Sequence, residues 1–159
     1  MPILMAMPER MAETWLGALA CAEEAKINTT EVNGRLVDDV SLPFVNDPAV
    51  LGEWVSVDFV RAPEQFAPGK SGFTGERYLR GLNFLPGGEM AWAVQSDKEA
   101  VLPWMAWTKG AVMHRGGDKT ASRYTIKEIG GAVYLFMEWK SGDYIIRHQK
   151  PSYYVLKKK

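Results

Sequence analysis

The most regular pattern of hydrophobic and polar positions lies in the last part of the chain. Residues 133–139 are dense in β-branched and aromatic side chains, and a Ser-Gly-Asp break at 141–143 separates them from a similar run at 144–148. A third apolar and aromatic run, 152–158, follows Pro151 and ends in lysines that keep it solvated. This pattern predicts three consecutive antiparallel strands.

A two-residue loop at Gly142-Asp143 sets the register of the first two of these strands. In that register Glu138 faces Arg147 and Met137 faces His148. We therefore expect an ion pair between Glu138 and Arg147 across the hairpin.

Earlier segments repeat the same alternation of strand-like runs and turn residues. No helical periodicity lies between them, so parallel crossovers are not expected. The chain therefore predicts a mainly β fold, an antiparallel up-and-down meander of about eight strands. Closure into a barrel removes both edges and leaves room for side chains or one small ligand, whereas an open or sandwiched sheet is the alternative. The expected earlier strands are 54–60, 77–85, 90–95, 104–114 and 122–129, with the longest loop at 63–75 and another loop at 96–102.

The N-terminal region has a different pattern. Residues 8–26 place apolar side chains such as Trp15 and Leu19 near one face, which predicts an amphipathic helix. Three surfaces could receive the apolar face of this helix: the outside of the main domain, the barrel mouth, or a second copy of the chain in a homodimer. Asn33-Gly34 predicts a short hairpin after it. We divide the chain into an N-terminal helical extension and linker, 1–41, and a barrel domain, 42–159.

Composition narrows the functions to consider. The 159 residues are long enough for one domain with a real core. Lysine plus arginine total 19 and aspartate plus glutamate total 19, so no basic field favours nucleic acid. The single Cys21 excludes an internal disulfide and fits a reducing compartment.

Localisation follows from two further features of the sequence. The first ten residues lack a basic leader and contain two prolines and two charged residues, so we expect a cytoplasmic protein rather than a secreted one. No run approaches the roughly 20 apolar residues that cross a bilayer, so a membrane span is not expected.

The segment 47–54, a proline-started turn that leads into Gly-x-Trp on the first barrel strand, resembles the opening of lipocalins and related calycin barrels. Together with WTKG (107–110), DKTA (118–121), WKSGDY (139–144) and KPSYYVLKK (150–158), it is similar to a lipocalin-like bacterial module that occurs alone or appended to other proteins, including some membrane sensor proteases. The resemblance implies the barrel and no catalytic residues. Lipocalins usually carry an arginine over the tryptophan, where this last strand offers lysines.

Alternation on the first barrel strand groups Trp54, Ser56 and Asp58 on one face. If Trp54 points inward, as the resemblance implies, Ser56 and Asp58 share the interior. A buried carboxylate costs several kcal/mol without a partner, so we expect a cation beside Asp58, supplied by Arg147, Lys109 or His114.

Two interpretations of these residues stay open. In the first, polar side chains and tryptophans line a ligand site. In the second, Asp58 lies at a solvent-exposed rim and Glu138–Arg147 is an exposed ion pair. The tryptophans, which include Trp104 and Trp139, then fill a packed interior. The candidate ligand-binding residues are Trp54, Ser56, Asp58, Trp92, Trp107, Glu138, Arg147 and Tyr154.

Other chemistry is not favoured. His114 and His148 lack metal-ligand spacing, so we expect no metal and no cofactor. The GKSGFTG loop, 69–75, lacks the glycine that a phosphate loop needs at position 64.

We therefore expect a non-enzymatic barrel that binds a small apolar or aromatic molecule. A protein-interaction or sensor module with a packed barrel is the alternative, and an enzyme that uses Asp58 or Glu138 as a general base is the least favoured.

Overall fold

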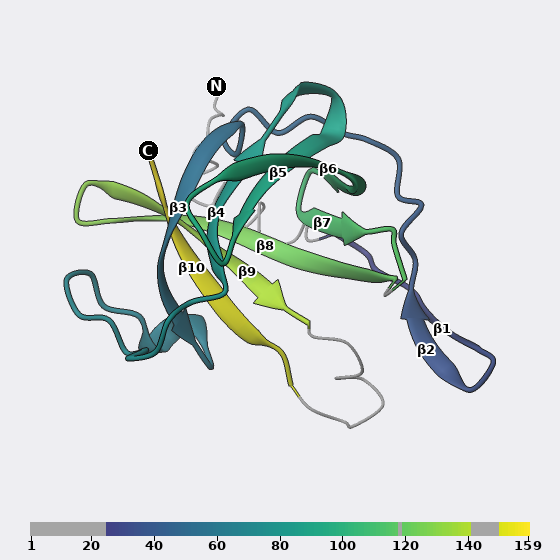
Figure 1. The fold of residues 1–159 in the computed structure, drawn as a ribbon, viewed down its shortest axis with the longest axis horizontal. Coiled ribbons are helices and arrows are strands. Elements are labelled where there is room, and N and C mark those ends of the chain that lie inside the picture. The colour runs from purple at the N-terminus through teal and green to yellow at the C-terminus, as the bar shows by residue number, and fades with distance from the viewer. Residues whose placement is uncertain (1–24, 118, 141–149) are drawn as a thin grey trace, which may run out of the picture.

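The computed structural model describes residues 25–117, 119–140 and 150–159 (Figure 1). Two short strands make a separate sheet, and eight others close into a barrel. Short 3₁₀ turns, η2 (Pro63–Gln65) and η3 (Pro86–Gly88), lie in two of the connections. The strands are β1 (Thr29–Val32), β2 (Arg35–Asp38), β3 (Gly52–Val60), β4 (Leu79–Phe84), β5 (Glu89–Val94), β6 (Glu99–Thr108), β7 (Ala111–His114), β8 (Thr120–Ile129), β9 (Ala132–Trp139) and β10 (Ser152–Lys158).

Closure of the barrel comes from the pairing of its first and last strands. Each barrel strand pairs antiparallel with the next along the chain, and β3 also pairs with β10, where Trp54 lies opposite Lys158 and Val60 opposite Tyr153. The barrel has no free edge. The predicted mainly β, closed up-and-down barrel is confirmed, and the open or sandwiched sheet is wrong.

The region 104–114 forms two strands where one was predicted. A turn at Lys109-Gly110 divides β6 from β7, and Gly110 takes a positive φ of 87° that a residue with a side chain rarely adopts. The sequence signal for this turn was the glycine between two apolar runs.

Strand β6 begins at Glu99, inside the segment predicted as the loop 96–102. The sequence did not predict this part of the strand because it contains Pro103, and proline has no N–H for a ladder hydrogen bond. The register between β5 and β6 shifts between Glu89 and Ala91, which pair with Ala106 and Val101 on either side of Pro103. The proline therefore lies at an irregularity of the ladder, where its missing N–H is tolerated.

Strand β9 pairs directly with β10, which overturns the predicted partner of Glu138. Trp139 lies opposite Ser152, and Glu138 lies opposite Tyr153 rather than Arg147. Arg147 and the predicted strand 144–148 lie outside the described residues. The barrel still contains eight strands because the region 104–114 supplies two.

A β-bulge changes the alternation of side chains along β3. Ser56 and Asp58 pair with the adjacent residues Leu156 and Val155 of β10, so Val57 is the extra residue. Paired residues on antiparallel strands share a face. Ser56 therefore faces the interior with Leu156, whereas Asp58 faces outward with Val155. The prediction that both residues share the interior is wrong for Asp58.

Apolar side chains form one core inside the barrel and a smaller one outside it. The inner core includes Trp54, Phe84 and Trp107. The outer core lies on β9 and β10, where the rings of Tyr134 and Phe136 contact Phe66, at centroid distances of 4.9 and 5.8 Å. Phe66 follows η2, so the long 61–78 connection packs on the outer wall of the barrel.

The β1–β2 hairpin projects from one side of the barrel beside the turn between β7 and β8 (Figure 1). Asn33 and Gly34 both have positive φ, 52° and 77°, as the predicted type I′ turn requires. The backbone N–H of Asp38 donates to the carbonyl of Lys119 at 2.9 Å, which fastens the hairpin to the barrel. The predicted helix over 8–26 lies outside the described residues except for Ala25 and Lys26, which are not helical.

Candidate functional site

The candidate site is an open pocket of about 450 Å³ at one end of the barrel. Its lining residues Val94, His114 and Trp139 end β5, β7 and β9, and Thr120 begins β8, so the pocket lies at the mouth where these strand ends meet. Aromatic side chains from four segments line it, and aliphatic side chains fill the floor between them. The aromatic residues are Tyr78, Trp92, Trp104 and Trp139, and the aliphatic ones are Val94, Leu102, Met105, Val112 and Met137.

The rings of Tyr78, Trp92 and Trp139 form a connected wall. The Trp139 centroid lies 6.2 Å from Trp92, 6.0 Å from Tyr78 and 5.0 Å from Tyr154. Trp104 and Tyr78 are 46% and 47% exposed, so they form the rim of the mouth, whereas Trp92 is 9% exposed and lies deeper. Such a wall offers ring faces and edges for contact with a flat molecule.

Polar side chains line a different part of the same pocket. His114 and Thr120 are paired across β7 and β8 and therefore share a face, and Ser122 follows two residues later on that face. These three side chains supply hydroxyl and imidazole groups, which can donate or accept hydrogen bonds. Lys140, just after β9, completes the polar lining.

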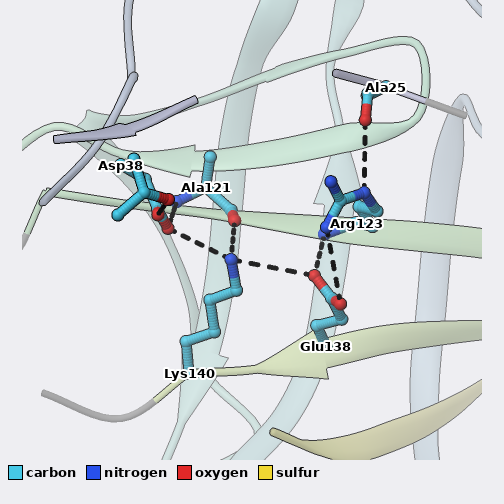
Figure 2. Close-up of polar contacts among 7 residues, drawn as sticks. Ala25, Asp38, Ala121, Arg123, Glu138 and Lys140 are labelled. Carbon is cyan, nitrogen blue, oxygen red and sulfur yellow. Dashed lines mark hydrogen bonds and ion pairs between the residues drawn. The ribbon is translucent and has the colours of Figure 1, made fainter. Parts of the chain in front are cut away.

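Lys140 connects the pocket to the β1–β2 hairpin (Figure 2). Its Nζ lies 3.1 Å from the Asp38 carboxylate and donates to the Ala121 carbonyl at 2.6 Å. Both charged side chains are buried, with 5% and 1% exposure. Asp38 also accepts hydrogen bonds from the Ala121 N–H and the Thr29 hydroxyl, both at 2.9 Å. The hairpin therefore fixes the position of a charged residue at the pocket.

Glu138 and Arg123 extend this network along the outer face of the barrel (Figure 2). The Glu138 carboxylate accepts the Arg123 backbone N–H at 2.8 Å and lies 3.8 Å from its guanidinium and 3.9 Å from Lys140 Nζ. The Arg123 guanidinium donates to the Ala25 carbonyl at 3.2 Å. Two acidic and two basic side chains thus balance each other beside the pocket, and both carboxylates lie outside its lining.

Among the predicted site residues that the structure describes, Trp92 alone lines this pocket. Trp54 and Trp107 lie at the opposite, closed end of the barrel, where their indole N–H groups donate to the carbonyls of Val50 and Leu85 at 2.8 Å. Both rings are 1% exposed. These two tryptophans pack the base of the barrel and stabilise it.

Asp58 is held by a loop rather than by the expected cation. Its carboxylate accepts hydrogen bonds from the backbone N–H groups of Phe59, Gly72 and Phe73 at 2.8 to 3.1 Å, and from the Ser71 hydroxyl at 3.2 Å. Backbone N–H groups satisfy a buried carboxylate as a cation would. The GKSGFTG segment therefore folds around Asp58.

Three other predicted site residues lie apart from the pocket, and Arg147 lies outside the described residues. Ser56 accepts a hydrogen bond from Arg77 Nε at 2.9 Å. Tyr154 lies behind Trp139 and its hydroxyl accepts the Leu79 N–H at 3.3 Å. Glu138 belongs to the outer network described above.

Most of the residues that line the pocket were not predicted from the sequence. Tyr78, Thr120, Ser122 and Lys140 were not considered, and His114, Trp104 and Trp139 were named but not chosen. Trp139 was recognisable, because it follows the inward Met137 by two residues on the same strand. Thr120 and Ser122 carried no signal of their own, since their role depends on how β7 pairs with β8.

The interior residue Tyr124 has a perturbed acidity. Burial raises the pKa of its hydroxyl, a hydrogen bond from the Gly110 backbone opposes this, and the hydrogen bond to Asp47 at 2.8 Å raises it further. Tyr124 therefore stays neutral and joins the core to the turn that precedes β3.

Searches for other kinds of site give negative results. Within 25–117, 119–140 and 150–159, no three His, Cys, Asp or Glu side chains cluster in a way that could hold a metal ion. No helix in this part of the chain is long and apolar enough to cross a membrane. Comparison with protein-family models, curated proteins and solved structures finds no match to this chain.

Proposed function

We propose that this protein is a non-enzymatic, lipocalin-like barrel that binds a small, partly apolar molecule in its mouth. The observation that carries the proposal is the pocket of about 450 Å³ with its wall of three tryptophans and a tyrosine. Its volume falls within the roughly 300–1,000 Å³ of typical small-molecule sites, which are mostly apolar with a few convergent polar groups.

The closed end of the barrel supports the kinship with lipocalins. Trp54 is the third residue of β3, the Gly-x-Trp strand, and Lys158 of the last strand lies over it, with Nζ 5.0 Å from the ring centroid. The Lys158 ammonium also donates to the carbonyls of Ala49 and Leu51 at 3.2 and 3.1 Å. Lys158 therefore covers the tryptophan ring with a cation, as the arginine of lipocalins is expected to do.

Two other functions have weaker support. Exposed Tyr78 and Trp104 give the mouth an apolar rim, which favours a protein-interaction module as the second candidate. The carboxylates on which an enzyme would depend, those of Asp58 and Glu138, lie outside the pocket lining. An enzyme is therefore the least supported of the three.

Titration with the neutral dye N-phenyl-1-naphthylamine tests the proposal. The dye should bind saturably, with enhanced fluorescence and a change in tryptophan emission. Ser122→Phe adds a ring to the pocket and should weaken binding about tenfold or more. Thr125→Phe makes a matched change at an exposed position of the same strand and should leave binding nearly unchanged.

Circular dichroism spectra of the two variants test whether each keeps the wild-type fold. Dye binding that is absent in the wild type, or unaffected by Ser122→Phe, would contradict the binding proposal. If the dye does not bind and a partner protein binds at the rim around Trp104, the interaction module would be favoured instead.

A further inference from the structure

The two parts of the pocket lining differ in chemistry, and this difference restricts the ligand. Trp92 and Trp139 supply aromatic rings whose planes are inclined at 41°. His114, Thr120 and Ser122, from β7 and β8, supply polar groups. A molecule that fills such a site needs a flat apolar body and at least one polar edge.

Trp92 adds a specific requirement. Its Nε1 is buried and has no hydrogen-bond acceptor among the described residues. The other two buried indoles, Trp54 and Trp107, each donate to a backbone carbonyl at 2.8 Å. A buried donor without an acceptor is unfavourable, and such groups are rare in folded proteins. The fold thus satisfies the two indoles of the closed end and leaves the indole N–H of Trp92, one of the residues that line the pocket, without an acceptor among the described residues.

The charged groups around the pocket indicate which net charge a ligand should carry. The titratable side chains in the described lining are Tyr78, His114 and Lys140, none of which is a carboxylate. The nearby carboxylates of Asp38 and Glu138 are engaged by Lys140 and Arg123. A cationic ligand would lose its hydration without gaining a carboxylate partner, which is costly.

We propose that the pocket takes a neutral or anionic planar aromatic molecule whose hydrogen-bond acceptor, a carbonyl or carboxylate oxygen, receives the Trp92 indole N–H. This inference rests on the proposed binding function and specifies its ligand class. The rings of Trp92 and Trp139 contact the aromatic body, and the β7–β8 side chains contact the polar edge.

Four naphthalene probes of nearly equal shape test the inference. They are 2-acetonaphthone, 2-naphthoate, 2-ethylnaphthalene and 2-naphthylmethylammonium, and their affinities are measured by displacement of N-phenyl-1-naphthylamine. The ketone and the carboxylate should bind about tenfold more tightly than the hydrocarbon, as expected for one buried hydrogen bond. The ammonium probe should bind most weakly.

Trp92→Phe keeps a ring and removes the N–H, so it should abolish the preference for the ketone over the hydrocarbon. Trp104→Phe makes the same change at the rim of the pocket and should preserve that preference. In wild-type protein labelled with ¹⁵N-tryptophan, the ketone should move the Trp92 indole N–H resonance downfield, and the hydrocarbon should not. This last measurement does not depend on whether the variants fold.

Equal affinity for ketone and hydrocarbon, tightest binding of the ammonium probe, or an unmoved Trp92 indole resonance would each overturn the inference. In those cases binding itself would stand, and so would the proposed function. If none of the four probes nor the dye binds the wild-type protein, both the inference and the proposed function fail.

Discussion

At the residue scale, the base of the barrel depends on single side chains with well-defined partners. Lys158 covers the Trp54 ring and donates to two carbonyls of the turn before β3. Trp54 in turn donates to the Val50 carbonyl of that turn. One lysine thus joins the last strand, the first strand and the turn that precedes it.

Lys158→Met should lower the free energy of unfolding by about 1–2 kcal/mol, because a cation–π contact and hydrogen bonds to two carbonyls are lost. Lys157→Met changes the exposed neighbouring lysine and is the matched control, with an expected change within about 0.5 kcal/mol. Urea denaturation measures both. Equal effects of the two substitutions would show that Lys158 does not stabilise the base.

Tyr124 gives a prediction about pH. Burial raises the pKa of its hydroxyl above the 10.0 of an unperturbed tyrosine, so only the unfolded state ionises Tyr124 above pH 10. The stabilising effect is complete below pH 10 and is lost as pH rises further. The free energy of unfolding should therefore fall more steeply between pH 9 and 11 in the wild type than in Tyr124→Phe. Parallel pH profiles of the two proteins would contradict this.

At the scale of elements, the β1–β2 hairpin and the barrel are connected through buried charges. Asp38 on β2 contacts Lys140 after β9 and accepts the Ala121 N–H of β8. The hairpin therefore stabilises the barrel and holds Lys140 in position at the pocket.

Asp38→Asn should cost about 3–5 kcal/mol of unfolding free energy, because the buried Lys140 ammonium loses the nearer carboxylate, at 3.1 Å, and keeps Glu138 at 3.9 Å. The Glu53–Lys159 pair is the control, since its side chains are 50% and 60% exposed at a similar distance of 3.1 Å. Glu53→Gln should cost less than about 1 kcal/mol. Chemical denaturation that gives similar values for both would show that burial of the Asp38 pair has little effect.

Periodicity in the sequence predicted most strands but not the irregularities that decide orientation. Alternation placed Trp54 and Ser56 correctly. It failed at Asp58, because a bulge is one extra residue whose position depends on packing against β10. The Lys109-Gly110 turn was missed because apolar residues continue on both sides of it. Pro103 hid part of β6, since proline usually marks the end of a strand.

The candidate site was predictable only in part. The abundance of tryptophan indicated an aromatic lining, and Trp92, one of the chosen residues, lines the pocket. Nothing in the sequence distinguished it from Trp54 and Trp107, whose indoles find carbonyl partners only once the base is folded. The polar wall depends on the β7–β8 register, and Lys140 is placed by a hairpin about a hundred residues away in the chain.

At the scale of the whole molecule, closure gives the barrel two unlike ends. One end is filled by Trp54, Phe84 and Trp107, and the other holds the pocket. Because the base is packed, a small molecule enters only from the mouth. We therefore expect binding to perturb the half of the interior at the mouth and to leave the half at the base unchanged.

The methionines make the most direct test of this claim, because two of those described lie at the pocket and two lie away from it, Met90 in the inner core and Met113 on the outer face of β7. Met105 and Met137 line the pocket, whereas Met90 and Met113 are buried outside its lining. In protein labelled with ¹³C at the methionine methyl groups, N-phenyl-1-naphthylamine should shift the signals of Met105 and Met137 and leave those of Met90 and Met113 in place. Shifts of all four signals, or of none, would contradict a binding pocket at the barrel mouth.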